Sequence, residues 1–113
     1  MGFTFLSAMA DLPASGVTGF DLDLAGEPLA LLALREGDQV RVFHNVCPHA
    51  GRRLEVAPGR FILDAGTVVC SAHGACFTIP EGHCIAGPCR GQSLRELPSE
   101  VREDGVWIDP TGD

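Results

Sequence analysis

Two short segments of the chain each place a cysteine and a histidine close together. The first is Cys47-Pro48-His49-Ala50-Gly51, and the second is Cys70-Ser71-Ala72-His73-Gly74. One residue separates the cysteine from the histidine in the first segment and two separate them in the second, so a thiolate and an imidazole can project from one loop toward a common point. The glycine that ends each segment allows backbone conformations that a Cβ would forbid. Two thiolates and two neutral imidazoles indicate a metal site.

The cysteine count supports metal binding over a disulfide framework. The chain has five cysteines, an odd number that fits a set of paired disulfides poorly. In a reducing compartment, a cysteine that lies next to a histidine more often serves as a metal ligand. The sequence therefore predicts that some of the cysteines bind metal.

The segments that must position these residues are short and separated by turns. Turn residues recur every eight to twelve residues or so, which is the spacing of an all-β sandwich or small barrel. Val40–His44 alternates apolar and polar side chains, as a half-buried strand does, and the apolar run Leu29–Leu34 predicts a buried strand. Residues 82–91 are rich in Gly and Pro and predict an ordered loop. The expected strands are Thr4–Leu6, Gly19–Leu24, Leu29–Leu34, Val40–His44, Phe61–Leu63, Thr67–Val69, Cys76–Ile79 and Val106–Ile108.

Composition limits the classes of partner. With 113 residues, 45% of them hydrophobic and 20% charged, the chain predicts one folded domain. The net charge of −7 argues against nucleic acid and favours a partner with a basic docking face. No apolar run is long enough to span a bilayer, and no Lys or Arg precedes the apolar stretch near the N-terminus, so we expect neither membrane association nor a signal peptide. A cytoplasmic location follows from this interpretation.

The spacing of the two segments is that of a known family. Cys-x-His, a stretch of about twenty residues and Cys-x-x-His form the ligand pattern of the Rieske proteins, and the chain resembles that family over most of its length. The similarity extends from Asp11-Leu12-Pro13 through Asn45–His49 to Gly87-Pro88 and Val106-Trp107. It implies a Rieske-like antiparallel β-sandwich or small barrel with a cluster-binding subdomain of two ligand loops. The single domain 1–113 would have a base of roughly residues 1–45 and 91–113 and a cluster-binding subdomain of roughly residues 46–90.

The resemblance also implies the cofactor and its ligands. One [2Fe–2S] cluster would be held by Cys47 and Cys70 on the buried iron, and by His49 and His73, through Nδ1, on the outer iron. Each histidine would present its Nε2–H to solvent. The alternative is a structural Cys₂His₂ zinc site. Zinc sites usually pair Cys with Cys and His with His along the chain, whereas each loop here carries one of each.

Residues around the ligand pattern indicate a low-potential member of the family. High-potential members carry an extra cysteine in each ligand loop and Ser and Tyr hydroxyls that bond the cluster region. Here Arg52 follows Gly51, Ala75 takes the place of the Ser, and the chain has no Tyr. Hydroxyl donors stabilise the more negative reduced state, so their absence predicts a potential near the bottom of the Rieske range, about −150 mV. Ala72 in the second loop leaves the exact value open.

The function implied by this branch is electron transfer. The chain resembles the Rieske ferredoxins that carry single electrons from a reductase to a terminal oxygenase, and we expect it not to be an enzyme by itself. We expect no mononuclear-iron domain after Asp113 and therefore no oxygenation by the chain itself. Two alternatives remain: a small non-catalytic subunit of a reductase complex, similar to that of assimilatory nitrite reductase, and a zinc-stabilised interaction module. The oligomeric state stays open and is compatible with a monomer.

The remaining candidate residues receive structural roles. Cys76 is expected in the core, and Cys84 and Cys89 are expected to be reduced thiols, with a local disulfide as the alternative. His44 and His83 have no cysteine at the right spacing and are not expected to be ligands. Trp107 is expected in the core, Arg52 and Arg53 on the solvated surface, and Pro88 in a third loop that shields the cluster.

Overall fold

Antiparallel strands make up about half of the described residues. The computed structural model describes residues 2–24, 26–48 and 51–111. Its elements are β1 (Thr4–Ser7), the 3₁₀ turn η1 (Met9–Asp11), β2 (Ser15–Leu24), β3 (Glu27–Glu36), β4 (Gln39–His44), β5 (Ile62–Asp64), β6 (Thr67–Val69), β7 (Cys76–Thr78), β8 (Cys84–Ala86), β9 (Glu96–Leu97), β10 (Ser99–Arg102) and β11 (Gly105–Ile108). The predicted all-β class is confirmed.

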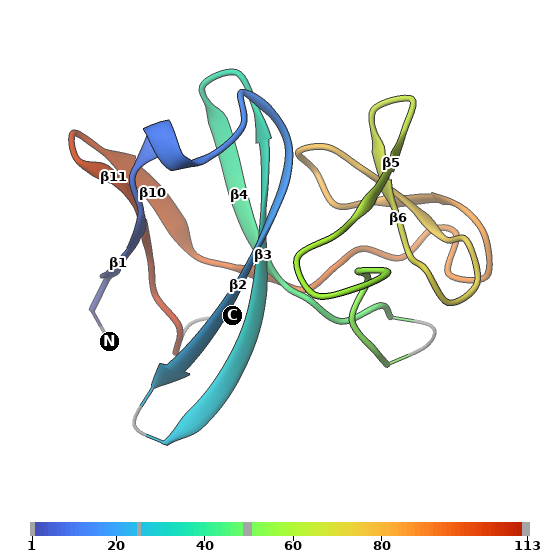
Figure 1. The fold of residues 1–113 in the computed structure, drawn as a ribbon, viewed down its shortest axis with the longest axis horizontal. Coiled ribbons are helices and arrows are strands. Elements are labelled where there is room, and N and C mark those ends of the chain that lie inside the picture. Colours follow the sequence, from blue (N-terminus) through green and yellow to red (C-terminus); the bar gives the residue numbers. More distant parts are fainter. Residues whose placement is uncertain (1, 25, 49–50, 112–113) are drawn as a thin grey trace.

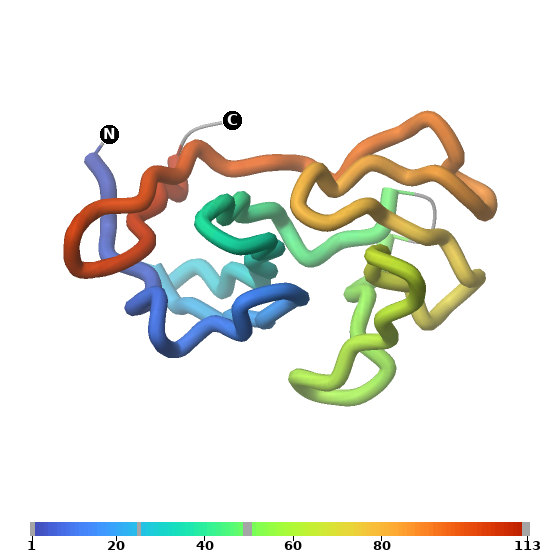
Figure 2. Tube along the Cα trace, turned by 90° about the horizontal axis from the view of Figure 1, so that it is seen from above, coloured from blue at the N-terminus to red at the C-terminus, as the bar shows by residue number. Residues whose placement is uncertain are grey.

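The strands form three antiparallel sheets. Their orders are β1-β11-β10, β2-β3-β4-β9 and β5-β6-β7-β8. In Figure 1 the sheet of β2, β3 and β4 stands in the middle, with β1, β10 and β11 on one side and β5 and β6 on the other. Seen from above in Figure 2, both ends of the chain lie in one half of the molecule, and the green to orange segments fill the other half. The described residues of the two Cys–His segments lie in this second half.

Strand β3 separates two hydrophobic cores. Side chains of a strand alternate between its faces. Leu31 and Ala33 enter one core, together with Val42 of β4 and Ile108 of β11, which we call the base core. Leu32 and Leu34 enter the other, which also holds Cys47, Cys70, Cys84 and Cys89 and which we call the cysteine-rich core. An uninterrupted apolar run is what a strand buried on both faces requires.

Three strands were not predicted. The segment 82–91, expected to be a loop, contains β8, whose residues Cys84 and Ala86 pair with Phe77 and Cys76 of β7. The rest of the segment is irregular, as its glycines and proline predict. Strands β9 and β10 were missed because they are short and carry little apolar periodicity.

Two side chains expected in the core are only half-buried. Cys76 lies on β7 next to Phe77, which is fully buried, so strand alternation turns Cys76 to the opposite face. Trp107 lies on β11 between Val106 and Ile108, both fully buried, and alternation turns its indole outward in the same way. Both predictions were wrong because they were based on the type of the residue and not on the face of the strand on which it lies.

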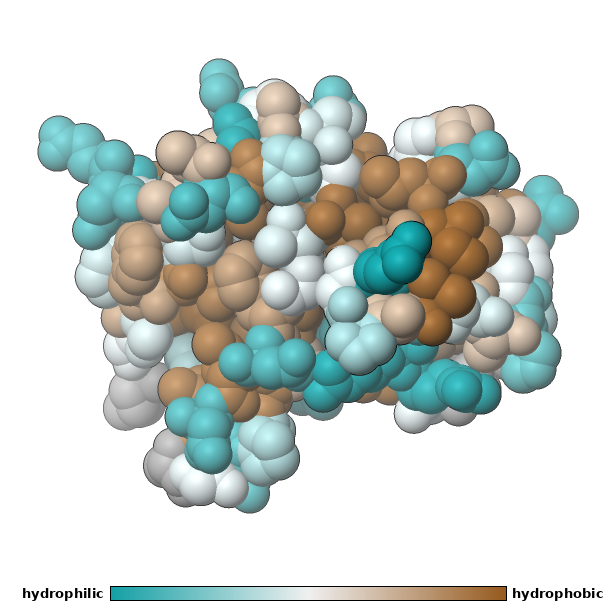
Figure 3. Space-filling model, in the orientation of Figure 1, coloured by the Kyte–Doolittle hydropathy of each residue, from teal (hydrophilic) through white to brown (hydrophobic). Residues whose placement is uncertain are grey.

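Some apolar surface remains exposed. In Figure 3 hydrophobic colouring gathers at the upper right of the visible face, in the half of the molecule that carries β5 and β6. Ile62 and Leu63 of β5 are 40% and 53% exposed, on a strand at the end of its sheet. No helix in the described part of the chain is long and apolar enough to cross a membrane.

Candidate metal centre

The first Cys–His loop, residues 47–51, closes on itself through its backbone. The N–H of Gly51 donates to the carbonyl of Cys47 at 2.8 Å, and the N–H of Cys47 donates to the carbonyl of Arg52 at 2.8 Å. Gly51 adopts φ +66°, in the left-handed region that a glycine enters without steric cost. His49 and Ala50 lie outside the described residues. The loop is a tight turn that holds the Cys47 backbone at its base.

The second Cys–His loop, residues 70–74, repeats this frame. The N–H of Gly74 donates to the carbonyl of Cys70 at 3.0 Å, and the N–H of Cys70 donates to the carbonyl of Ala75 at 2.7 Å. Gly74 adopts φ +77°. Both loops therefore use a cysteine at the first position, a left-handed glycine four residues later and the same two backbone hydrogen bonds, although the histidine is third in one loop and fourth in the other.

The two loop cysteines converge in the interior. Cys47 and Cys70 are each 1% exposed and pack in the cysteine-rich core. Burial raises the pKa of the Cys70 thiol, and the neighbouring Cys47 thiol raises it further, whereas hydrogen bonds from the backbone amides of Ala72 and His73 lower it. Those two amides stabilise a charged sulfur. Two adjacent buried thiols, one of them already supplied with amide donors, fit the thiolate side of an iron–sulfur site.

The structure describes only the histidine of the second Cys–His loop. His73 is exposed, whereas Cys70 on the same loop is buried, so the second loop presents its imidazole to the surface and its sulfur to the core. His49 lies outside the described residues. Among the described residues, no three His, Cys, Asp or Glu side chains gather in the way that a metal site requires. The four-residue ligand set thus stays a prediction.

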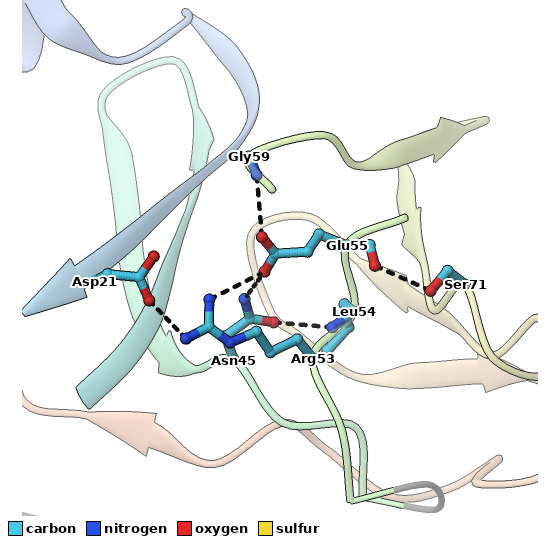
Figure 4. A network of polar contacts seen from close by, with 7 residues as sticks. All are labelled: Asp21, Asn45, Arg53, Leu54, Glu55, Gly59 and Ser71. Carbon is cyan, nitrogen blue, oxygen red and sulfur yellow. Dashed lines mark hydrogen bonds and ion pairs between the residues drawn. The ribbon is translucent and has the colours of Figure 1, made fainter. Parts of the chain in front are cut away.

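A buried amide ties the start of the first loop to the chain that follows it. Asn45 is 2% exposed; its Nδ2 donates to Glu55 at 2.6 Å and its Oδ1 accepts from the Leu54 N–H at 3.0 Å (Figure 4). The second carboxylate oxygen of Glu55 accepts from the Gly59 N–H at 3.0 Å. Because Asn45 precedes Cys47 by two residues, this network fixes the direction in which the chain enters the loop.

The same segment holds the second loop. Ser71 donates its N–H to the Leu54 carbonyl at 3.0 Å and its hydroxyl to the Glu55 carbonyl at 3.0 Å. Arg53 forms ion pairs with Asp21 of β2 at 2.7 Å and with Glu55 at 3.9 Å, as Figure 4 shows. The hydrogen bond with Asp21 is the main cause of the raised pKa of Arg53. Residues 53–55 thus connect both Cys–His loops to the central sheet.

We expect Asn45→Ala to lower the free energy of unfolding by about 2–3 kcal/mol. The change leaves the buried Leu54 N–H without its acceptor and removes a donor from the Glu55 carboxylate. Urea unfolding of the protein with its metal bound measures the effect. The control Gln39→Ala, at the exposed start of β4, should change stability by less than about 0.5 kcal/mol. Equal effects of the two changes would show that the amide network contributes nothing.

Residues 84–92 form a third loop beside the two Cys–His loops. A Cβ on Gly87 would lie 2.7 Å from the Cα of Ala75, the residue that follows the second Cys–His loop. Pro88 is exposed next to this contact. The third loop therefore packs its backbone directly against the end of the second Cys–His loop. That it shields a cluster stays a prediction.

We expect Gly87→Ala to be more destabilising than Gly91→Ala by about 1–3 kcal/mol. Both glycines have similar positive φ values, +96° and +93°, so the strain of a side chain in that conformation is similar. Only at Gly87 does the new Cβ meet backbone, whereas at Gly91 nothing lies within 4 Å. Thermal unfolding and metal content of both variants measure the difference. Identical behaviour would contradict the close packing of the third loop.

Cys84 and Cys89 are not joined by a disulfide in the structure. Both are 1% exposed, and the Cys89 thiol donates to the Cys84 sulfur at 3.0 Å. Burial, together with the neighbouring thiols of Cys84 and Cys47, raises the pKa of Cys89 to about 12. Spacing alone did not indicate that this pair lies next to Cys47.

The two remaining histidines lie at the surface side of the site. The Nδ1 of exposed His83 is 3.0 Å from the Ser93 hydroxyl. Half-buried His44 lines a surface pocket with Val46, Pro48, Ser93 and Arg95, beside the first Cys–His loop.

Comparisons with known proteins agree with this arrangement. The model of the Rieske [2Fe–2S] domain matches residues 3–100. No curated protein matches the chain by sequence. Among solved structures, the chain is similar to the ferredoxin of carbazole 1,9a-dioxygenase from Nocardioides aromaticivorans IC177, with a TM-score of 0.71, 22% identity, and coverage of 98% of this chain and 100% of that one.

Two further structures share the fold. One is a chain in the complex of reduced oxygenase and oxidized ferredoxin in carbazole 1,9a-dioxygenase, with a TM-score of 0.74, 22% identity, and coverage of 98% of this chain and 95% of that one. The other is the terminal oxygenase of carbazole 1,9a-dioxygenase from Novosphingobium sp. KA1, with a TM-score of 0.72, 19% identity, and coverage of 95% of this chain but 29% of that one. The chain belongs to the Rieske [2Fe–2S] domain family, and this membership implies one cluster of the Rieske type.

Proposed function

We propose that this protein is a one-electron carrier that receives electrons from a reductase and delivers them to an oxygenase-type enzyme. The observation that carries the proposal is its match in fold to a dioxygenase ferredoxin over nearly the whole length of both chains. The oxygenase chain with the same fold is more than three times as long as the matched part. Full-length agreement with the carrier component favours the carrier role.

The proposed ligands are Cys47, His49, Cys70 and His73. The two buried cysteines support the assignment of the inner iron, because the cysteine-rich core keeps water from their sulfurs. Exposed His73 supports the assignment of the outer iron, since an imidazole at the surface gives a partner a short path. When bound, the cluster supplies a reversible one-electron couple. The protein residues hold it and set its distance from the surface.

The net charge, the free cysteines and the sheet arrangement support proposals about the partners, the location and the subdomains of the protein. The net charge of −7 favours docking on basic faces of the partners. Five free cysteines are compatible with a reducing compartment, and we propose the cytoplasm. The three-sheet arrangement supports a cluster-binding subdomain of roughly residues 46–90 on a base of roughly residues 1–45 and 91–113.

A reconstitution experiment tests the function. Protein with its cluster intact is combined with a ferredoxin reductase and a ring-hydroxylating oxygenase from the same organism, and product is measured under air. We expect product only when all three components are present. If the protein is reduced by the reductase but transfers no electrons to any such oxygenase, and is isolated bound to a large reductase, the carrier proposal is wrong and the subunit alternative is favoured.

A further inference from the structure

The thiols of Cys84 and Cys89 are already in contact. Their sulfurs are 3.0 Å apart, with the Cys89 S–H pointing to Cys84, and Cys84 in turn donates to the Ala86 carbonyl at 3.2 Å. A disulfide bond is about 2.05 Å long, so closure requires the two sulfurs to approach by only about 1 Å. Among the described cysteines outside the predicted ligand set, Cys84 and Cys89 form the pair whose sulfurs are in contact.

The backbone holds the pair in this position. The N–H of Cys84 donates to the Gln92 carbonyl at 2.8 Å, the N–H of Gly91 donates to the Cys84 carbonyl at 3.0 Å, and the N–H of Gln92 donates to the Cys89 carbonyl at 2.9 Å. Residues 85–88, which link the two cysteines, are exposed. The pair therefore lies at the base of a surface loop, where a modest opening of that loop admits a small reagent.

The pair also touches the predicted iron site. Cys47, Cys84 and Cys89 pack together in the cysteine-rich core. A hydrogen-bond donor to a cluster sulfur stabilises the more negative reduced state. The two thiols of the pair lie in the same core as Cys47 and are polar S–H groups near that sulfur.

We propose that Cys84 and Cys89 form a reversible dithiol–disulfide pair that modulates the adjacent cluster. The oxidant is a low-molecular-weight disulfide such as oxidised glutathione. One cysteine, as thiolate, attacks a sulfur of that disulfide, its S–S bond breaks, and one small thiol leaves. The other cysteine then attacks the mixed disulfide and releases the second small thiol. The pair loses two electrons and two protons, and the oxidant gains them as two thiols.

The proposed consequence is a change in potential. The disulfide has no S–H, so oxidation removes two hydrogen-bond donors from the core that Cys47 shares, and the reduced cluster loses the stabilisation that they offer. We expect the potential to become more negative in the disulfide form. This part rests on the proposed ligand Cys47, whereas formation of the disulfide rests only on the geometry of the pair.

The test uses the cluster-loaded protein under anaerobic conditions, incubated with oxidised glutathione. We expect intact mass to fall by two hydrogens, alkylation to show two fewer free thiols, and peptide mapping to join Cys84 to Cys89, while the visible spectrum of the cluster persists. The potential should shift in the negative direction, and dithiothreitol should reverse both changes. Cys89→Ser should show neither change, and the control Cys76→Ser should respond like the unmodified protein.

Each part has its own contradicting result. Free Cys84 and Cys89 after conditions that fully oxidise an exposed dithiol peptide would overturn the disulfide. A stable glutathione adduct as the end product would do the same. A disulfide with an unchanged potential would overturn the coupling to the cluster. Absence of the iron–sulfur spectrum before any oxidant is added would instead contradict the proposed function, independently of the thiol count.

Discussion

Cys70→Ser is expected to abolish cluster binding, with iron and acid-labile sulfide falling from two each per chain to near zero. Cys70 is 1% exposed, lies beside Cys47, and receives hydrogen bonds from the backbone amides of Ala72 and His73. A serine hydroxyl stays protonated at neutral pH and is a harder ligand than the soft thiolate that holds iron–sulfur clusters. Cys47→Ser should have the same effect, because both sulfurs are assigned to one iron.

A cysteine nearby provides the control. Cys76 lies on β7, six residues beyond Cys70, and is half-buried with its thiol donating to the Gly74 carbonyl at 3.4 Å. Cys76→Ser should retain the iron and sulfide content of the unmodified protein. Iron and sulfide analysis of the three variants, each purified without air, tests whether Cys70 and Cys47 are cluster ligands. A Cys70→Ser protein with full iron and sulfide would show that Cys70 is not a ligand.

His73→Cys is expected to keep iron, provided it folds, and to lower the reduction potential from the Rieske range toward about −400 mV, the value typical of all-cysteine plant-type clusters. A thiolate replaces a neutral imidazole, so the site carries one more negative charge and the reduced state becomes less favourable. His73 is exposed, which leaves room for the change. His49→Cys should lower the potential in the same direction.

Voltammetry or a dye-coupled titration measures this shift. The control is His83→Gln, since His83 is exposed and its Nδ1 contacts the Ser93 hydroxyl. Its potential should match that of the unmodified protein. An unchanged potential in His73→Cys, with iron retained, would mean that the second loop does not contribute its imidazole.

The fold could be predicted where residue type and spacing act locally. The apolar run Leu29–Leu34 predicted a buried strand, and the structure places this strand between two cores. Strand β9 could not be predicted, because it exists through pairing with β4, far away in the sequence. Strand β10 was missed although only two residues separate it from β11, because it carries little apolar periodicity. Strand β8 was not predicted, because the glycines on both sides of it favour a loop. Its pairing with β7 outweighs the local preference for a loop.

Part of the candidate site could also be predicted from the sequence, and part could not. Spacing identified the two Cys–His loops, and the structure brings Cys47 and Cys70 together. The supporting network of Asn45 and Glu55 gave no signal, because an Asn before a loop and a Glu after it are common on any surface. Only the fold shows that the two side chains meet in a buried position.

Iron, acid-labile sulfide and zinc analysis of anaerobically purified protein, with the visible spectrum before and after dithionite, tests the central claim most directly. The family assignment and the two Cys–His loops predict two iron atoms and two sulfides per chain, no stoichiometric zinc, and a coloured protein that bleaches reversibly on one-electron reduction. A colourless protein with one zinc per chain and no labile sulfide would contradict it.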